Sequence, residues 1–442
     1  MTHTSLLVAL QERLSPELRD LLLAVQRAAG EVETPLWVVG GAVRDLLLPD
    51  RAILSEIDLA VGADLAVGIR ATGGEELASG VAGIAEAVSG RTGAKIHRHD
   101  IFGTASLELG GVRIDMARSR RERYPRPGAL PIVAAASIDD DLARRDFTIN
   151  AMAFALGGPE AGRLLDPCGG AHDLERGLLR ILHDGSFRDD PTRLVRGCRY
   201  AARIDGRFAP GTSRAARRDT HYITSLSASR FGDAWRLLVS DRAASGALQR
   251  AHRLRLASGW LPGWKLSGAV RHTYDPGSAA EWELPAAELY LALSGLSTLD
   301  RNILTALPQR CALTRNEQRA LEGGVVLRGR RSALGRRGVR TSRVVASLRD
   351  IPPAALAAAY ASWTGVAGNR VEAFLDTWRY VESPLDAASL ARIGVEPGRA
   401  VGRTLERLRD QVLDGTLAPG DSVSAERWLH SRRERTAAES VD

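Results

Sequence analysis

The chain has 442 residues, enough for two to four domains at ~100–200 residues each. Its 44% hydrophobic and 26% charged residues are typical of a globular protein, which argues against intrinsic disorder and against a fibrous repeat. No run approaches the ~20 apolar residues of a membrane span. Gln11, Glu12 and Arg13 fall where a signal peptide needs an apolar core, so we expect a soluble, cytoplasmic protein.

The net charge of +7 is unevenly distributed along the chain. Residues 1–205 hold 25 basic and 29 acidic residues, whereas residues 206–442 hold 35 basic and 24 acidic. This asymmetry predicts chemistry in the front half and binding of a polyanion in the rear half. For any single arginine, a solvated helix face is the simpler explanation. The three scattered cysteines favour small buried apolar groups over disulfides.

Apolar periodicity predicts the elements of the front half in chain order. Residues 5–29 have helical spacing, residues 36–39 form a short buried strand, and residues 53–61 form a second strand. Residues 95–109 and 111–118 are predicted to pair as strands.

Further along, strand patterns give way to helical ones. Residues 119–131 are basic and contain three prolines, which favours a mobile loop. The pattern becomes helical from Asp139, with a helix expected to start in 143–156 and an amphipathic one in 190–204. We therefore predict an α+β protein, with a small head and mixed sheet in 1–155, a helical neck in 156–210, and a helical body and tail in 211–442.

Gly40, Gly41 and Arg44 belong to GGAVRD (40–45), between a predicted strand and a predicted helix. The glycines let a phosphate approach the backbone closely. The helix N-terminus offers free N–H groups to an anion, and Arg44 can add a charge-assisted contact. A plain strand–helix turn explains the same pattern.

Glu56 and Asp58 are two residues apart on the next predicted strand, so their side chains share a face. Adjacent carboxylates repel unless a cation holds them, and Mg²⁺ prefers such oxygen ligands together with substrate phosphates. Asp115, on a later strand, can supply a third carboxylate, as in sites where two metals position the attacking and leaving oxygens. The alternative is the solvent face of an ordinary strand.

Two arginine-rich segments complete the candidate site. In ARRDFTINAMA (143–153), an arginine, Arg144 or Arg145, can hold a triphosphate and Asp146 can accept from a ribose hydroxyl, unless this is only a solvated helix N-terminus. In DDPTRLVRGCRYAARI (189–204), four arginines lie along one helical stripe: Arg193, Arg196, Arg199 and Arg203. Because four like charges repel, we expect an anion or an acidic surface to face them.

The chain resembles class II tRNA nucleotidyltransferases and bacterial poly(A) polymerases, whose ordered motifs match GGAVRD, EID, FGTASLELGGVRIDMARSRRERY, LARRDFTINAMAF and DDPTRLVRGCRYAARI. The resemblance covers about residues 36–208, and beyond 210 only the general helical character is shared. Five motifs in order do not arise from composition.

The resemblance implies a role for each motif residue. Glu56 and Asp58 would occupy the metal-binding positions. The nucleotide-binding residues would be Gly40, Gly41, Arg44, Arg145, Asp146, Asp190, Arg193, Arg196 and Arg199. Among them, Asp190 and Arg193 would present a Watson–Crick-like edge to the incoming base, since a carboxylate and a guanidinium offer acceptors and donors in fixed geometry.

Two positions depart from the pattern of that family. Glu56 stands where the family usually has Asp, and its extra methylene moves the carboxylate by about 1 Å. Gly197 stands where the family usually has Ala, at a cost of ~1 kcal/mol in helix propensity.

The expected function is template-independent addition of nucleotides from CTP and ATP to the 3′ end of tRNA. The tRNA 3′-hydroxyl would attack the α-phosphate while Mg²⁺ ions at Glu56 and Asp58 stabilise the attacking and leaving oxygens. Poly(A) polymerase and enzymes adding only CC or only A remain open alternatives. The alternative to an enzyme is a homologue that has lost catalysis and only binds RNA. Glu56 supports this alternative, whereas the intact GGAVRD, RRD and DDPTR segments argue against it.

The densest basic segment is RGRRSALGRRGVRTSR (328–343), with seven arginines in sixteen residues. Its glycines and serines predict a loop or a helix junction. Arg336 and Arg337 are the candidate contacts to RNA phosphates. A solubilising surface run is the alternative.

Overall fold

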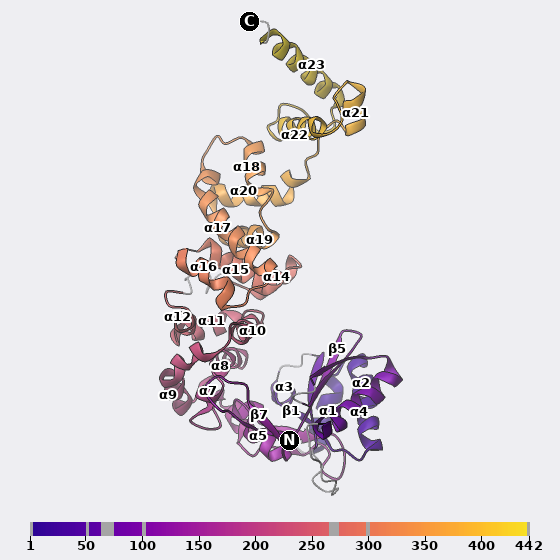
Figure 1. The fold of residues 1–442 in the computed structure, drawn as a ribbon, viewed down its shortest axis with the longest axis vertical. Coiled ribbons are helices and arrows are strands. Elements are labelled where there is room, and N and C mark those ends of the chain that lie inside the picture. The colour runs from indigo at the N-terminus through magenta and orange to yellow at the C-terminus, as the bar shows by residue number, and fades with distance from the viewer. Residues whose placement is uncertain are drawn as a thin grey trace. The chain divides into compact units, whose positions relative to one another are not determined.

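The computed structural model describes residues 3–49, 53–62, 75–99, 103–264, 274–297 and 301–439 (Figure 1). The chain divides into two compact units, residues 1–262 and 263–442, which are described in turn. The head, neck and body boundaries near residues 155 and 210 stay a prediction. In the part of the chain that the structure describes, no helix is long and apolar enough to cross a membrane.

The N-terminal segment forms two helices, α1 (His3–Arg13) and α2 (Pro16–Glu31), so the prediction of one helix was wrong. Ser15 separates them: its hydroxyl accepts a hydrogen bond from the backbone N–H of Leu18 at 3.2 Å and caps α2. Pro16 lacks an N–H and has a fixed φ, which suits the first turn of a new helix better than the continuation of an old one.

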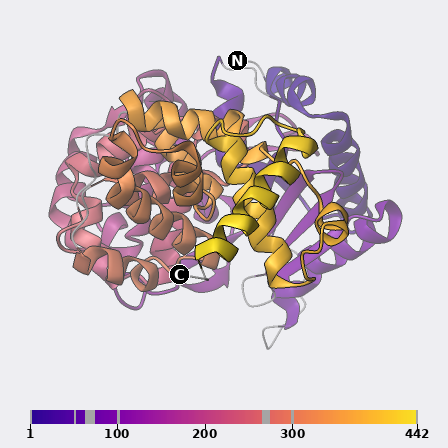
Figure 2. The ribbon, with the colours of Figure 1, turned by 90° about the horizontal axis from the view of Figure 1, so that it is seen from above.

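Unit 1 contains a seven-stranded mixed sheet in the order β3-β4-β5-β2-β1-β8-β9. The strands are β1 (Leu36–Val39), β2 (Glu56–Val61), β3 (Lys95–His99), β4 (Thr104–Leu109), β5 (Val112–Arg118), β8 (Ala153–Ala155) and β9 (Leu164–Leu165). Strands β2 and β5 are parallel and the other pairs are antiparallel, which confirms the predicted pairing of 95–109 with 111–118. Helices α2 and α4 (Glu75–Thr92) pack together and against β4 and β5, and the indigo and violet helices flank the strands in both views (Figures 1 and 2).

In the middle of unit 1 one prediction was wrong, and a second was wrong only for the four residues of a short strand. The segment expected to start a helix in 143–156 instead contains β8, which follows α5 (Ile138–Ala143) and the 3₁₀ turn η2 (Thr148–Asn150). Strand β8 is buried throughout, and a short buried apolar run has the same appearance in a strand and in a helix.

The predicted loop 119–131 begins as a strand, because β6 (Arg120–Arg123) pairs antiparallel with β7 (Ile132–Ala135). Its charges suggested a solvated loop. However, Glu122 is almost fully buried between Arg120 and Arg144, at 3.1 and 2.6 Å.

The rest of unit 1 is mostly helical. Its elements are α6 (Gly170–Glu175), β10 (Leu178–Leu179), α7 (Ser186–Asp189), α8 (Thr192–Arg203), β11 (Arg207–Phe208), α9 (Pro210–Asp219), η3 (Thr220–Ser225), α10 (Ala228–Val239), α11 (Ala244–Arg253) and α12 (Leu256–Trp260). Helix α8 confirms the helix predicted in 190–204, and it packs against α10 and α11.

Within its described residues, unit 2 has only helical elements, which confirms the predicted fold class. They are α14 (Pro276–Glu281), α15 (Ala286–Leu296), α16 (Arg301–Arg310), α17 (Arg315–Gly335), α18 (Thr341–Leu348), α19 (Pro353–Ser362), α20 (Gly365–Asp376), η4 (Trp378–Tyr380), α21 (Ala387–Arg392), α22 (Arg399–Leu413) and α23 (Ser422–Glu439). Helices α15 and α17 approach closely at Gly324, where a Cβ atom would lie 2.2 Å from the carbonyl oxygen of Ala292. The arginine-rich segment 328–343 spans the end of α17 and the start of α18, as a helix junction should.

Candidate active site

A cavity of about 930 Å³ opens in unit 1, lined by residues of β1, β2, β4 and β5 and by α3 (Gly41–Leu47), α8 and α10. It brings together every residue predicted for catalysis or nucleotide binding: Gly40, Gly41, Arg44, Glu56, Asp58, Asp115, Arg145, Asp146, Asp190, Arg193, Arg196 and Arg199. The two predicted RNA contacts, Arg336 and Arg337, belong to unit 2.

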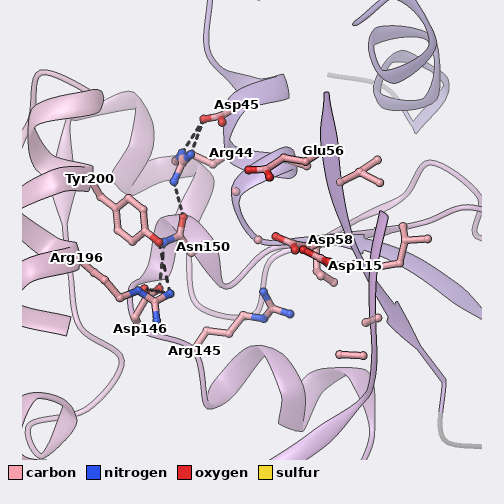
Figure 3. A pocket seen from close by; sticks show the side chains of 18 of the residues that line it. Arg44, Asp45, Glu56, Asp58, Asp115, Arg145, Asp146, Asn150, Arg196 and Tyr200 are labelled. Carbon is pink, nitrogen blue, oxygen red and sulfur yellow. Dashed lines mark hydrogen bonds and ion pairs between the residues drawn. The ribbon is translucent and has the colours of Figure 1, made fainter. Parts of the chain in front are cut away.

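One wall of the cavity carries the predicted carboxylates. The parallel register of β2 and β5 sets Asp58 opposite Asp115, and their carboxylates lie side by side (Figure 3). Burial, followed by the charges of Asp115 and Glu56, raises the pKa of Asp58, although Arg145 and Arg113 act in the opposite sense. The wall therefore holds negative charges that repel one another.

The carboxylate wall suits a hard divalent cation. In the described part of the chain, no three His, Cys, Asp or Glu side chains are gathered into a ready-made metal cage. Mg²⁺ is usually bound through one or two carboxylates together with substrate phosphates rather than by an all-protein cage. Glu56 and Asp58 offer that number of oxygen ligands, and the raised pKa of Asp58 reflects a carboxylate that a cation would stabilise.

Gly40 and Arg145 form a second wall. Gly40 has φ +71°, and a Cβ atom there would lie 2.8 Å from Nη1 of Arg145, so only glycine leaves room for this guanidinium. Nη2 of Arg145 donates to Oδ2 of Asp141 at 2.8 Å, which fixes the side chain. Burial of Asp141 opposes ionisation, but Arg145 and Arg144 outweigh it and lower its pKa.

Buried polar side chains connect this wall to α8 (Figure 3). Arg44 is 1% exposed and donates to Oδ1 of Asn150 at 2.9 Å as well as to the adjacent Asp45. Asn150 in turn donates to Oδ1 of Asp146 at 3.0 Å, and Nη2 of Arg196 lies 2.7 Å from Oδ2 of Asp146. Sequence reasoning missed Asn150, because an amide on a short turn carries no periodic signal.

Asp146 is 4% exposed and remains a good site for negative charge. Burial alone would raise its pKa, but Arg196, the Asn150 amide and Arg193 lower it below the ordinary value. The charge of Asp146 correspondingly raises the pKa of Arg196.

Asp190 and Arg193 lie at the start of α8. Oδ1 of Asp190 accepts from the backbone N–H and the hydroxyl of Thr192 at 3.1 and 2.7 Å, and from Nη2 of Arg230 at 2.8 Å. Arg193 is 4% exposed and donates to Oγ of Ser186 at 2.7 Å and to the carbonyl oxygen of Arg144 at 2.9 Å. Arg230 was missed because it follows residue 208, where the recognisable motifs end.

The arginine stripe of α8 faces an acidic surface, as its charge required. Arg196 pairs with Asp146, and Arg203 lies 2.7 Å from Oδ2 of Asp241, which Arg199 approaches at 3.9 Å. Tyr200 lies among these cations: Arg199 stands over its ring at 4.9 Å, and its hydroxyl accepts from Arg199 at 3.2 Å and from Arg196 at 3.4 Å. Burial would raise the pKa of Tyr200, but Arg196 and Arg199 lower it.

Comparison with known proteins points to one family. Residues 36–180 match the model of the poly A polymerase head domain. The chain is 32% identical over 417 residues to a CC-adding tRNA nucleotidyltransferase of Deinococcus radiodurans, and the alignment covers 92% of each chain. It is 40% identical over 198 residues to an A-adding tRNA nucleotidyltransferase of Halalkalibacterium halodurans, covering 45% of this chain but only 42% of that relative.

Solved structures agree with this relationship. An apo form of a CCA-adding enzyme is similar with a TM-score of 0.75 and 26% identity, over 96% of this chain and 98% of the other. The Thermotoga maritima CCA-adding enzyme complexed with tRNA gives a TM-score of 0.71 at 26% identity, over 96% and 97%. Similar structures also include a CCA-adding enzyme complexed with ATP and with CTP. Since the identity to the CC-adding enzyme extends over nine tenths of both chains, this chain belongs to the class II tRNA nucleotidyltransferase family, whose members are transferases.

Proposed function

We propose that this protein adds C and A nucleotides from CTP and ATP to the 3′ end of tRNA without a nucleic-acid template. The observation that carries the proposal is the cavity of unit 1, which joins a carboxylate wall to the buried acid and arginine side chains of α8. The complexes of similar enzymes with tRNA, ATP and CTP support it. In this scheme residues 1–155 catalyse, residues 156–210 recognise the base, and residues 211–442 bind tRNA.

Glu56 and Asp58, with Asp115 beside them, are the residues that would hold Mg²⁺. A divalent cation there supplies positive charge to the attacking and leaving oxygens of nucleotidyl transfer. Arg145 lies over the Gly40 backbone on the neighbouring wall, fixed by Asp141, and is placed to bind the triphosphate. The protein thereby contributes positioning and electrostatic stabilisation rather than a covalent step.

Base recognition is assigned to Asp190 and Arg193. Three donors hold Oδ1 of Asp190, whereas its Oδ2 makes no hydrogen bond to any residue that the structure describes. Arg193 uses two of its five N–H groups on Ser186 and Arg144. One free acceptor and several free donors, all in fixed positions, are what reading a base edge requires.

RNA binding is assigned in part to Arg336 and Arg337. Both are exposed at the junction between α17 and α18, and their side chains make no ion pair with described residues. The junction backbone is held, since Arg370 donates to the carbonyl oxygens of Leu334 and Arg336 at 2.6 and 2.7 Å. Two unpaired arginines on a fixed backbone suit phosphate contacts.

Addition of CC alone is the second candidate function. The CC-adding enzyme of D. radiodurans matches this chain along 92% of its length, whereas the A-adding relative matches less than half.

One experiment separates these possibilities. The purified protein is incubated with tRNA that lacks the whole CCA end, that ends in the first C or that ends in CC, and with each labelled nucleotide in turn. CCA addition requires two cytidines and then one adenosine; a CC-adding enzyme stops after the second cytidine; a poly(A) polymerase adds many adenosines. Binding of tRNA without incorporation would refute the enzyme proposal, and Asp58→Asn serves as the inactive control.

A further inference from the structure

Arg113 occupies an unexpected place among the predicted metal ligands. It lies on β5 opposite Glu56 of β2, and two residues before Asp115 on the same face of the strand. Its Nη2 atom is 3.1 Å from Oε2 of Glu56 and 3.1 Å from Oδ2 of Asp115. One guanidinium nitrogen therefore bridges two carboxylates of the cluster.

Arg113 is the cation that pairs directly with two members of this cluster. The other nearby guanidinium, Arg145, is bound to Asp141. Oδ1 of Asp115 accepts from the hydroxyl of Ser106, which leaves Oδ2 to Arg113. Without a metal, Arg113 offsets part of the repulsion between Glu56 and Asp115, with which it pairs directly.

The contacts of Arg113 can be exchanged easily. The side chain of Arg113 is 45% exposed and that of Glu56 is 71% exposed. Ion pairs with this exposure are weak and are readily replaced by other ions. A divalent cation binding Glu56 through the same oxygen must compete with Arg113.

We propose that Arg113 is a built-in counter-cation: it bridges Glu56 and Asp115 in the metal-free protein and releases Glu56 when a divalent cation binds. The inference rests on the proposed metal site, and it makes Arg113 a positioning residue that sets the metal affinity. The longer side chain at position 56 fits this role, because it carries the carboxylate out of the cavity wall toward the guanidinium.

Binding of Mn²⁺ to the full chain without nucleotide, measured by electron paramagnetic resonance of the free ion, tests the proposal. Arg113→Gln removes the competing charge and should tighten Mn²⁺ binding about three- to tenfold, since two weak ion pairs are lost. Arg113→Lys keeps the charge and should stay within about twofold of wild type. The matched control is Arg91→Gln: Arg91 pairs with Glu31 at 2.6 Å with comparable exposure, and neither residue lines the cavity.

The outcomes are distinguishable. Tighter Mn²⁺ binding in Arg113→Gln, with Arg91→Gln unchanged, supports the proposal. Equal or weaker binding in Arg113→Gln, while Asp58→Asn abolishes binding, overturns this inference and leaves the metal site intact. Mn²⁺ binding that Asp58→Asn does not reduce overturns the metal site and this inference together. The rise in unfolding temperature on adding Mn²⁺ is an independent readout, and it should be largest in Arg113→Gln.

Discussion

The substitution Asp58→Asn should have opposite effects on nucleotide addition and on the free energy of unfolding. The substitution keeps the shape of the side chain and removes its charge. Burial, then Asp115 and Glu56, raise the pKa of Asp58 in the folded protein. A raised carboxyl pKa means that folding disfavours the ionised form. At pH 7 this charge therefore lowers the free energy of unfolding of the metal-free protein.

The magnitude follows from the position of Asp58. One pKa unit corresponds to about 1.4 kcal/mol, but Asp58 is open to the water of the cavity, which screens the repulsion. We expect Asp58→Asn to raise the free energy of unfolding at pH 7 by no more than ~1 kcal/mol, or about 1–3 °C in midpoint. The gain should vanish below about pH 4, where Asp58 is protonated in both the folded and unfolded states.

Activity should change in the opposite direction. Loss of a metal ligand should reduce nucleotide addition at least ~1,000-fold, which is about 4 kcal/mol of transition-state stabilisation. The affinity for tRNA should stay near wild type, because the proposed RNA contacts lie in unit 2. The assays are incorporation of labelled nucleotide, tRNA binding, and calorimetry in EDTA at pH 7 and pH 3.5. Asp20→Asn, an exposed carboxylate on α2, is the control for loss of charge.

Two results would refute this reasoning. If a folded Asp58→Asn protein keeps activity within tenfold of wild type, or loses tRNA binding, Asp58 is not the metal position. If its metal-free form is less stable than wild type at pH 7, the electrostatic account of the wall is wrong.

Four further substitutions test the remaining assignments. Glu56→Asp restores the usual acid of the family and should preserve or raise nucleotide addition; a large drop would show that the site depends on the longer side chain. Arg193→Ala should reduce the kcat/KM preference for CTP and ATP over UTP and GTP by ~1–3 kcal/mol, and equal losses for all four nucleotides would contradict the base-edge role. Arg230→Gln should reduce the same preference less, since it only removes one donor to the recognition carboxylate. Arg336→Ala combined with Arg337→Ala should flatten the dependence of log tRNA affinity on log salt by ~1–2, and an unchanged slope would remove this junction from the interface.

Part of the site could be predicted because some of its residues stand next to strongly buried strands. Glu56 and Asp58 begin a strand whose remaining residues are buried, and Gly40 follows another buried strand. A run of buried apolar residues shows where a strand begins or ends. The type of the residue beside that run, such as a carboxylate or a glycine, then indicates its role. All twelve predicted residues, whether chosen beside such runs, from the arginine spacing of 193–203 or from the motifs of the family, line the same cavity.

Partners across the fold could not be predicted in the same way. Arg230 and Asp241 contact the site from segments far along the chain, and local periodicity does not show which segments meet. The sequence shows Arg113 as a charged residue within the predicted strand 111–118, but it does not show what Arg113 contacts. Its contact with Glu56 depends on the parallel register of β2 and β5, and no turn between the strands fixes that register.

The two sides of the cavity differ in charge balance, and the difference bears on substrate binding. Along α8, buried carboxylates already pair with the arginines, as Asp146 does with Arg196. On the sheet, the weakly held Arg113 and the nearby Arg145 only partly offset three carboxylates, and Arg145 has donors left beyond its bond to Asp141. In the proposed function, a nucleoside triphosphate arriving with a divalent cation would correct both imbalances at once, because the cation would meet the carboxylates and the phosphates would meet Arg145. Metal and nucleotide should therefore each strengthen the binding of the other.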